Sequence, residues 1–166
     1  MVELKQLSPE SIPSALEKAV RYRLLNQPWE AENIYLDILQ VDPDHQEALV
    51  GLLLAITDQF HEGLPGSVGQ ARELLGRIRG EYERAYYAGI ICERRAKAVL
   101  QQSRPGSGQI AHELLQQARG WYEQAERLRP PGNDDALLRW NACVRLETRH
   151  PHIGAAQEER YQPYAD

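Results

Sequence analysis

The chain has 166 residues, of which 42% are hydrophobic and 26% charged, and its formal net charge is −5. This is enough chain for about one globular domain, and the composition excludes a wholly disordered or collagen-like protein. The mild acidity argues against a protein whose main partner is nucleic acid, because such domains are usually strongly basic.

Helices are predicted along the whole chain, because Ala, Leu, Glu, Gln and Arg dominate and no segment alternates as a half-buried strand does. The first helix is predicted at about residues 11–25 and the second at 28–41. After an Asp-Pro-Asp turn, Asp44 and Glu47 are predicted to cap a third helix. This third helix is apolar almost all round at residues 49–56, so we expect it to lie between neighbours.

A loop rich in glycine, residues 63–67, separates the third helix from the fourth. Ser67 and Gln70 have the spacing of a capping box that would open the fourth helix. Gly63, Gly66 and Gly69 are spaced like a phosphate cradle, but no strand precedes them and no Gly-Lys-Ser/Thr follows. We therefore interpret the loop as a flexible turn.

The C-terminal half is predicted to contain three further helices and a tail. The helices are expected at about residues 81–102, 108–129 and 133–148, the last capped by Asn133 or Asp134. The residues after them, 149–166, are predicted to be a loosely held tail.

An internal repeat is found when the second helix is aligned with the sixth. The pattern Ala31-x-x-x-Tyr35-x-x-Ile38-x-x-x-x-Pro43 matches Ala118-x-x-x-Tyr122-x-x-Ala125-x-x-x-x-Pro130 position for position. The fourth helix carries a weaker copy without the proline, at Ala71, Leu75 and Ile78.

This spacing resembles the second helix of the tetratricopeptide repeat, whose signature is a small residue, an aromatic, a small or apolar residue, and then proline. Residues that match its first helix are Ala19, Tyr22, Ala85, Ala88, Gly89 and Cys92. In such repeats small residues let the paired helices approach closely, the aromatic fills the gap to the next pair, and proline ends the second helix. The resemblance covers about residues 12–148.

The resemblance implies an all-α superhelix, or solenoid, of about three helix pairs closed by a capping helix. The implied pairs are residues 12–45, 46–80 and 81–132, with the cap at 133–148. Residues 1–148 would then form one helical repeat domain, and residues 149–166 a flexible tail. The fifth and sixth helices are each about two turns longer than the repeat allows, so we expect a long antiparallel hairpin.

In this family a bound peptide usually lies in the concave groove along the first helix of each pair. Alignment gives the groove positions here as Leu16, Val20, Arg23, Val50, Leu54, Thr57, Tyr86, Ile90, Glu93, Leu137 and Asn141. Members that clamp the terminal carboxylate of chaperones use Lys and Asn at set positions of the first helices. This chain has Leu16, Val20, Val50 and Leu54 there, so a carboxylate clamp is not implied.

The predicted protein-binding residues are Leu54, Tyr86, Tyr87 and Ile90 as apolar anchors and Arg94 as a polar contact. Three tyrosines, at 82, 86 and 87, cluster at the start of the fifth helix. They cannot all point inward on one helix, so at least one is expected to be exposed. A role as core filler is an equally good interpretation. Trp29, Trp121 and Trp140 are predicted to pack between helix pairs.

Charge is distributed unevenly along the chain. Residues 1–60 carry ten acidic and four basic residues, whereas residues 61–129 carry eleven basic and eight acidic ones. One interpretation is a basic surface on the fourth and fifth helices that receives an acidic segment. The other is a solvated face in which the bases pair with Glu81, Glu83 and Glu93. Nucleic acid is disfavoured, because no aromatic residues alternate with these bases as stacking platforms.

The sequence contains no recognisable catalytic or metal-binding motif. The five histidines form no HExxH pattern, and no group of His, Cys and acidic residues has zinc-ligand spacing. We interpret His150-Pro151-His152 as part of a solvated tail. Ser67 and Ser107 lack a matching His–acid pair and sit where N-caps belong. We therefore predict no catalytic activity, no cofactor and no metal.

Cysteine usage and the N-terminal sequence indicate the compartment. Cys92 and Cys143 fall at core positions of predicted helices, so buried thiols in a reducing compartment are expected. The N-terminus lacks the basic start and apolar run of a secretory signal. The longest apolar run, residues 48–57, is too short to span a bilayer. We expect a cytoplasmic protein that has no membrane partner.

The sequence thus predicts a non-catalytic scaffold, adaptor or assembly chaperone that binds a protein or peptide segment in the groove. Two alternatives stay open. One is a self-associating structural module, such as a homodimer, in which the hairpin of the fifth and sixth helices or the groove packs against a second copy. The other is a nucleic-acid-binding helical repeat that uses the arginines of the fourth and fifth helices.

Overall fold

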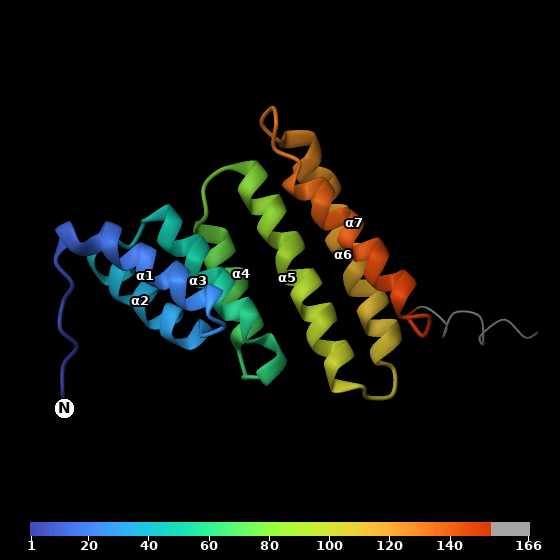
Figure 1. The fold of residues 1–166 in the computed structure, drawn as a ribbon, viewed down its shortest axis with the longest axis horizontal. Coiled ribbons are helices and arrows are strands. Elements are labelled where there is room, and N and C mark those ends of the chain that lie inside the picture. The colour runs from blue at the N-terminus through green and yellow to red at the C-terminus, as the bar shows by residue number, and fades with distance from the viewer. Residues whose placement is uncertain (154–166) are drawn as a thin grey trace, which may run out of the picture. The chain divides into compact units, whose positions relative to one another are not determined.

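The computed structural model describes residues 1–153, which form seven α-helices and two short 3₁₀ turns and contain no strand (Figure 1). The predicted all-α class is confirmed. The chain divides into two compact units, of which the first spans Met1–Arg79 and the second begins at Gly80. The division lies next to the predicted boundary between the second and third helix pairs. That the helices form one repeating superhelix stays a prediction.

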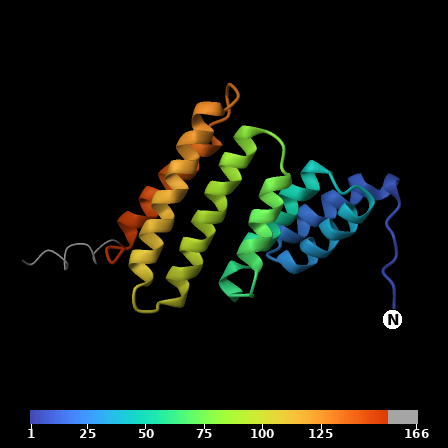
Figure 2. The ribbon, with the colours of Figure 1, turned by 180° about the vertical axis from the view of Figure 1, so that it is seen from behind.

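The first unit contains four helices: α1 (Ile12–Leu24), α2 (Pro28–Val41), α3 (Gln46–Asp58) and α4 (Ser67–Arg77). Consecutive helices run in opposite directions, as Figure 1 and the reverse view in Figure 2 show. Each helix packs against the next, and α1 also contacts α3. Most residues of α3 are buried, which confirms that this helix, apolar almost all round, lies between neighbours.

The second unit is a helical hairpin with a third helix packed against it. It consists of α5 (Glu81–Gln102), α6 (Ser107–Leu128) and α7 (Asp135–Arg149). The two helices of the hairpin have 22 residues each and pack against one another extensively, which confirms the long hairpin predicted from the sequence. α7 packs against α6.

Three helix starts differ from the predicted caps. At α6 the N-cap is Gly106, and Ser107, which was expected at a cap position, is already helical. At α3 the N-cap is His45 rather than Asp44, and its Nδ1 accepts a hydrogen bond from a backbone N–H three residues further on, at 3.2 Å. At α4 the cap position is Gly66, and Ser67 is already helical, so the predicted capping box with Gln70 does not form. Gly66 has φ +81°, a conformation that glycine adopts without strain.

The end of the described chain is held against the second unit. Asn133, one of the two predicted caps of α7, accepts a backbone N–H at the start of that helix. α7 ends at Arg149, a turn at residues 150–153 follows, and Ile153 is buried. The rest of the predicted tail, residues 154–166, lies outside the described residues.

The repeated residues occupy equivalent positions in the two units. All six non-proline members are buried: Ala31, Tyr35, Ile38, Ala118, Tyr122 and Ala125. α2 and α6 both end two residues before the proline of the pattern, at Val41 and Leu128. Proline stops them because it has no backbone N–H and disfavours helical geometry in the residue before it.

Both tyrosines of the repeat rest on a glycine of a neighbouring helix. Tyr35 lies against Gly51 of α3 and Tyr122 against Gly89 of α5, and a Cβ at either glycine would overlap the ring. In the first unit the aromatic therefore meets the following helix, as predicted. In the second unit Tyr122 meets the preceding helix instead.

The prediction for the cysteines is confirmed, whereas the prediction for two of the tryptophans is wrong. Cys92 and Cys143 are buried, as predicted. Trp29 and Trp121 are exposed, so the prediction that they pack between helix pairs is wrong. Trp140 is half-buried, and its Nε1 donates to a glutamate of α6 at 3.0 Å.

Candidate functional site

The five predicted binding residues lie on both units. Leu54 is a half-buried residue of α3, and the other four lie on α5. Tyr86, Tyr87 and Arg94 are half-buried, whereas Ile90 is only 4% exposed and offers a partner little surface. That all five share one groove stays a prediction.

Tyr82, Tyr86 and Tyr87 form a connected group of rings on α5, called here the tyrosine cluster. Tyr82 stacks on Tyr86 with 5.9 Å between ring centroids, and Tyr87 meets Tyr86 edge-on at 5.1 Å. All three residues are half-buried, so the expectation that at least one is exposed is wrong. The rings shield one another, which spacing along a helix does not reveal.

The tyrosine cluster is anchored to the hairpin through Tyr86, whose hydroxyl stays uncharged. The ring of Tyr86 lies 5.9 Å from that of Tyr122 on α6. Burial raises the pKa of Tyr86 to about 12, with a smaller opposing effect from Arg139. Its hydroxyl is therefore neutral at physiological pH and is able both to donate and to accept a hydrogen bond.

A buried ion-pair network joins the three helices of the second unit around Glu93, whose side chain is 1% exposed. Lys97 Nζ donates to Oε1 at 2.6 Å, Tyr122 Oη donates to Oε2 at 2.7 Å, and Arg139 donates to both oxygens. Burial alone would raise the pKa of this carboxyl. Lys97, Arg139 and Tyr122 outweigh burial and hold the pKa below its usual value, so Glu93 is ionised at neutral pH.

The partners of Glu93 were not predicted from the sequence. Glu93 was expected either in the groove or on a solvated face, and the structure buries it instead. Its spacing of four residues from Lys97 is a signal that could have been used. Arg139 lies 46 residues further along the chain, and no local pattern links it to Glu93.

The first unit has a related ion pair beside its own repeat tyrosine. Arg23 Nε of α1 lies 2.8 Å from Asp58 Oδ2 of α3. Burial raises the pKa of Tyr35 on α2, and the charges of Arg23 and Asp58 act on it in opposite directions. In each unit, therefore, an ion pair links two helices that are separated along the chain by the helix carrying the tyrosine.

A surface hollow lies between α1 and α3. It is lined by Pro13, Leu16, Glu17, Val20, Arg21 and Glu47. Leu16 and Val20 were predicted as groove positions, and Val20 is exposed. In the first unit, two predicted groove residues therefore do line a hollow that is open to solvent.

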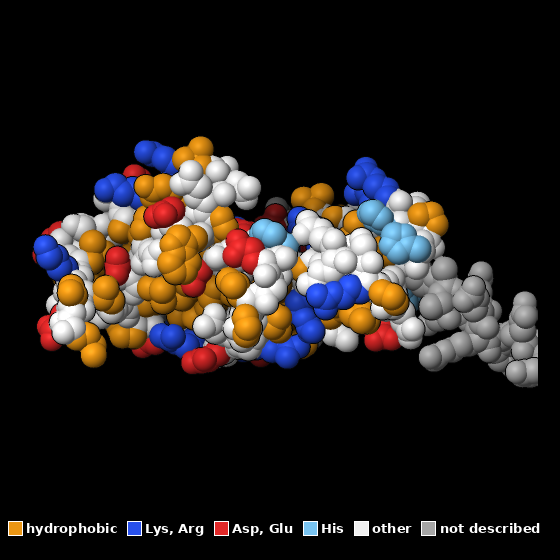
Figure 3. All heavy atoms as spheres, turned by 90° about the horizontal axis from the view of Figure 1, so that it is seen from below, with side chains coloured by type: hydrophobic (Ala, Val, Ile, Leu, Met, Phe, Trp, Pro, Cys, Tyr) orange, Lys and Arg blue, Asp and Glu red, His pale blue; other side chains and the backbone are white. Residues whose placement is uncertain are grey.

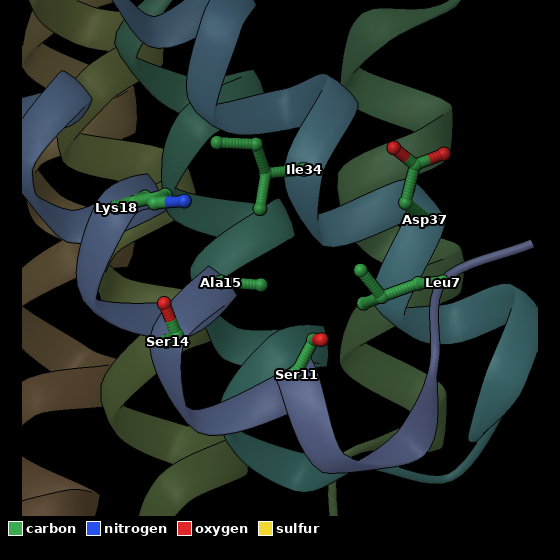
Figure 4. Close-up of a pocket in the computed structure, with 7 residues that line it drawn as sticks. All are labelled: Leu7, Ser11, Ser14, Ala15, Lys18, Ile34 and Asp37. Atoms are coloured by element: carbon green, nitrogen blue, oxygen red, sulfur yellow. The ribbon is translucent and has the colours of Figure 1, made fainter.

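A second hollow, of about 300 Å³, lies between α1 and α2 (Figure 4). Leu7 of the N-terminal segment closes one side, and Ile34 and Asp37 come from α2. The hydroxyl of Ser14 and the ammonium of Lys18 belong to exposed residues. Because both residues are open to solvent, this hollow is a weaker candidate than the tyrosine cluster.

The predicted basic residues also divide between the units. Arg77 and Arg79 belong to the first unit, where the Arg77 guanidinium donates to a backbone carbonyl and Arg79 lies 4.0 Å from Asp44. Lys97 of the second unit pairs with Glu93. Figure 3 shows basic, acidic and hydrophobic side chains interspersed on the face drawn. A single basic surface on α4 and α5 stays a prediction.

Residues 1–153 contain neither a metal-ligand cluster nor a membrane-spanning helix. No group of three or more His, Cys, Asp or Glu side chains is placed there to hold a metal ion. The rings of His150 and His152 meet edge to face, 5.6 Å apart. Within the same residues, every helix is too short or too polar to cross a membrane.

Comparisons with models of known protein families, with curated proteins and with solved structures find no match to this chain. The likeness to the tetratricopeptide repeat therefore rests on the repeated residues of α2 and α6 and on their burial. Membership of that family stays a prediction.

Proposed function

We propose that this protein is a non-catalytic interaction module, a scaffold, adaptor or assembly chaperone that binds a segment of another protein. The observation that carries the proposal is the tyrosine cluster. Three half-buried rings on one helix, with Tyr86 in contact with both others, leave part of their apolar surface open to a partner. Tyrosine is enriched among binding hot spots, because it offers this area with few rotatable bonds.

The tyrosine cluster is held in place before any partner arrives. Tyr86 contacts Tyr122, which is buried and donates its hydroxyl to Glu93. Glu93 is in turn held by Arg139 of α7. A surface fixed in this way loses little conformational freedom on binding, so more of the contact energy appears as affinity.

The polar contact proposed beside the tyrosine cluster is Arg94. It follows Tyr87 by seven residues, two helical turns, so both lie on the same face of α5, about 10 Å apart along the axis. A partner segment with an apolar side chain and an acidic one at that separation fits both. In an extended segment this separation corresponds to about three residues.

The groove proposed from the sequence has a counterpart in the first unit. Leu54 and the hollow lined by Leu16 and Val20 are proposed as apolar contacts of the first unit by itself. Their role follows from the family resemblance and is secondary to that of the tyrosine cluster.

The chemistry of the cysteines supports a non-catalytic role. Burial raises the pKa of Cys143 to about 12, so the thiol is protonated at neutral pH and is a poor nucleophile. Cys92 is also buried.

A nucleic-acid partner is not proposed, because the bases of α4 and α5 divide between the units and several pair with groups of the chain itself.

Photo-crosslinking tests the proposed surface directly. A photoreactive phenylalanine analogue is placed at Tyr87 and, as a matched control, at Leu36, an exposed residue of α2. After irradiation in lysate of the source cells, we expect defined protein adducts from position 87 and none from position 36. Absence of adducts at position 87, or the same adducts at both positions, contradicts the proposal.

A further inference from the structure

Helix α6 carries an apolar stripe beside the face that it buries in its own unit. The buried face contains Ala111, Leu115, Ala118, Tyr122 and Ala125. The neighbouring stripe, called here the α6 stripe, consists of Ile110, Leu114, Gln117, Trp121, Gln124 and Leu128. Leu114 is buried, but Ile110, Trp121 and Leu128 are 49%, 41% and 40% exposed.

The third helix of the unit leaves this stripe uncovered. α7 lies along the opposite flank of α6, where its Glu147 meets His112 and Arg119 and its Trp140 meets Glu123. With about 100° of rotation per residue, these contacts lie on the other side of the buried face from the α6 stripe. The exposed apolar residues thus face away from α7.

The spacing of the α6 stripe is that of a coiled-coil seam. Its members follow one another at intervals of four, three, four, three and four residues. The mean interval of about 3.5 residues keeps such a row facing a second helix over its whole length. The row contains no charged residue, which is unusual for an exposed helix face in a chain with 26% charged residues.

We propose that the α6 stripe binds the α6 stripe of a second copy of this chain, with the two helices antiparallel about a two-fold axis. The interval pattern reads the same in both directions, so an antiparallel copy aligns in register. Ile110 then meets the second copy's Leu128, and Gln117 meets the second copy's Trp121. By the two-fold symmetry each contact occurs twice.

Charge complementarity identifies the second copy as the occupant. The residues that flank the α6 stripe on its outer side, one per heptad, are Glu113, Gly120 and Arg127. In an antiparallel pair Glu113 faces the second copy's Arg127, and Arg127 faces the second copy's Glu113. Gly120 meets its own equivalent at the axis, where a Cβ added to it would have nothing within 4 Å. A parallel pair would instead place both charges opposite alanines.

Sedimentation equilibrium of the full chain and of charge variants tests the proposal. The wild-type chain is expected to form dimers as its concentration rises. Arg127→Glu and Glu113→Arg each place like charges at both flanking contacts, and we expect each to weaken dimerisation about tenfold. Both residues are exposed, and circular dichroism checks that the variants fold.

An equal mixture of the two variants gives the sharpest result. A Glu113→Arg copy carries arginine at both flanking positions and an Arg127→Glu copy carries glutamate at both. Their mixed dimer therefore regains two attractive contacts, and we expect it to form about as tightly as the wild type. Such rescue requires that these residues face one another across an interface.

Three results would overturn the proposal. They are a wild-type chain that stays monomeric up to about 1 mM, charge variants that dimerise like the wild type, and a mixture no tighter than its components. If the chain is monomeric, the α6 stripe would instead be a binding face for a helix of another protein. The test is independent of the proposed function, since Tyr87→Ala changes the tyrosine cluster and should leave the dimerisation constant unchanged.

Discussion

At the scale of single residues, Glu93 shows how partner groups stabilise a buried charge. Removing a carboxylate from water costs several kcal/mol, and the cost is offset only when partners and hydrogen bonds surround it. Here Lys97, Arg139 and Tyr122 supply them from three helices. Because the charge joins α5, α6 and α7 at one point, it contributes to holding the tyrosine cluster in place.

Glu93 makes the stability of the protein depend on pH in acid solution. Its pKa is lowered in the folded protein relative to the ordinary value of 4.5. A group of this kind stabilises the fold fully above the unfolded pKa, and the contribution is lost as pH falls through the folded pKa. Urea unfolding of the wild type and of Glu93→Gln should therefore differ most at neutral pH.

Measurement of the same two proteins in acid solution provides a control. Below the folded pKa, Glu93 is protonated and resembles the glutamine that replaces it, so the two proteins should converge in free energy of unfolding. Glu73→Gln, at an exposed carboxylate of α4, should show little difference from the wild type at any pH. A difference for Glu93→Gln that stays constant from pH 7 to the acid limit would show that its charge is not the cause.

At the scale of helices, close approach depends on the glycines that face the repeat tyrosines. Tyr35 and Tyr122 lie where a Cβ on Gly51 or Gly89 would have to be. A core cannot absorb added atoms there without moving a ring or a helix. The small and aromatic positions of the repeat are therefore complementary shapes on adjacent helices.

Replacing a glycine by alanine is expected to change the free energy of unfolding in opposite directions at a packed position and at an open one. Gly51→Ala should lower the free energy of unfolding by about 1–3 kcal/mol, because its methyl group overlaps the Tyr35 ring. Gly76→Ala in α4 meets nothing within 4 Å and should raise the free energy of unfolding by up to about 1 kcal/mol. Chemical denaturation measures both, and an equal effect at the two sites would contradict the packing argument.

At the scale of the whole molecule, the sequence predicts where helices form but not which distant residues come into contact. Prolines and glycines mark the ends of the helices, so α2, α5 and α6 were placed within about two residues. The capping box at Ser67 failed because the left-handed Gly66 takes the cap position. Contacts such as the one between Glu93 and Arg139 depend on tertiary packing. No local pattern in the sequence indicates them.

The candidate site was predicted in part for the same reason. Tyr86 and Tyr87 were singled out by their spacing on one helix, and both have surface to offer. Ile90 shares that face by sequence and is nevertheless buried. Which of several apolar residues on a helix stays accessible depends on its neighbours in space, and periodicity along one element does not contain that information.

The central claim is that the tyrosine cluster with Arg94 binds a protein segment, and selection from a random peptide library tests it most directly. The full wild-type chain serves as bait, and the double variant Tyr87→Ala, Arg94→Ala is the counter-selection. We predict enrichment of peptides with an apolar and an acidic residue about three positions apart. These peptides should bind the double variant at least about tenfold more weakly. Failure to enrich any such pattern, or peptides that bind both proteins equally, would contradict the account.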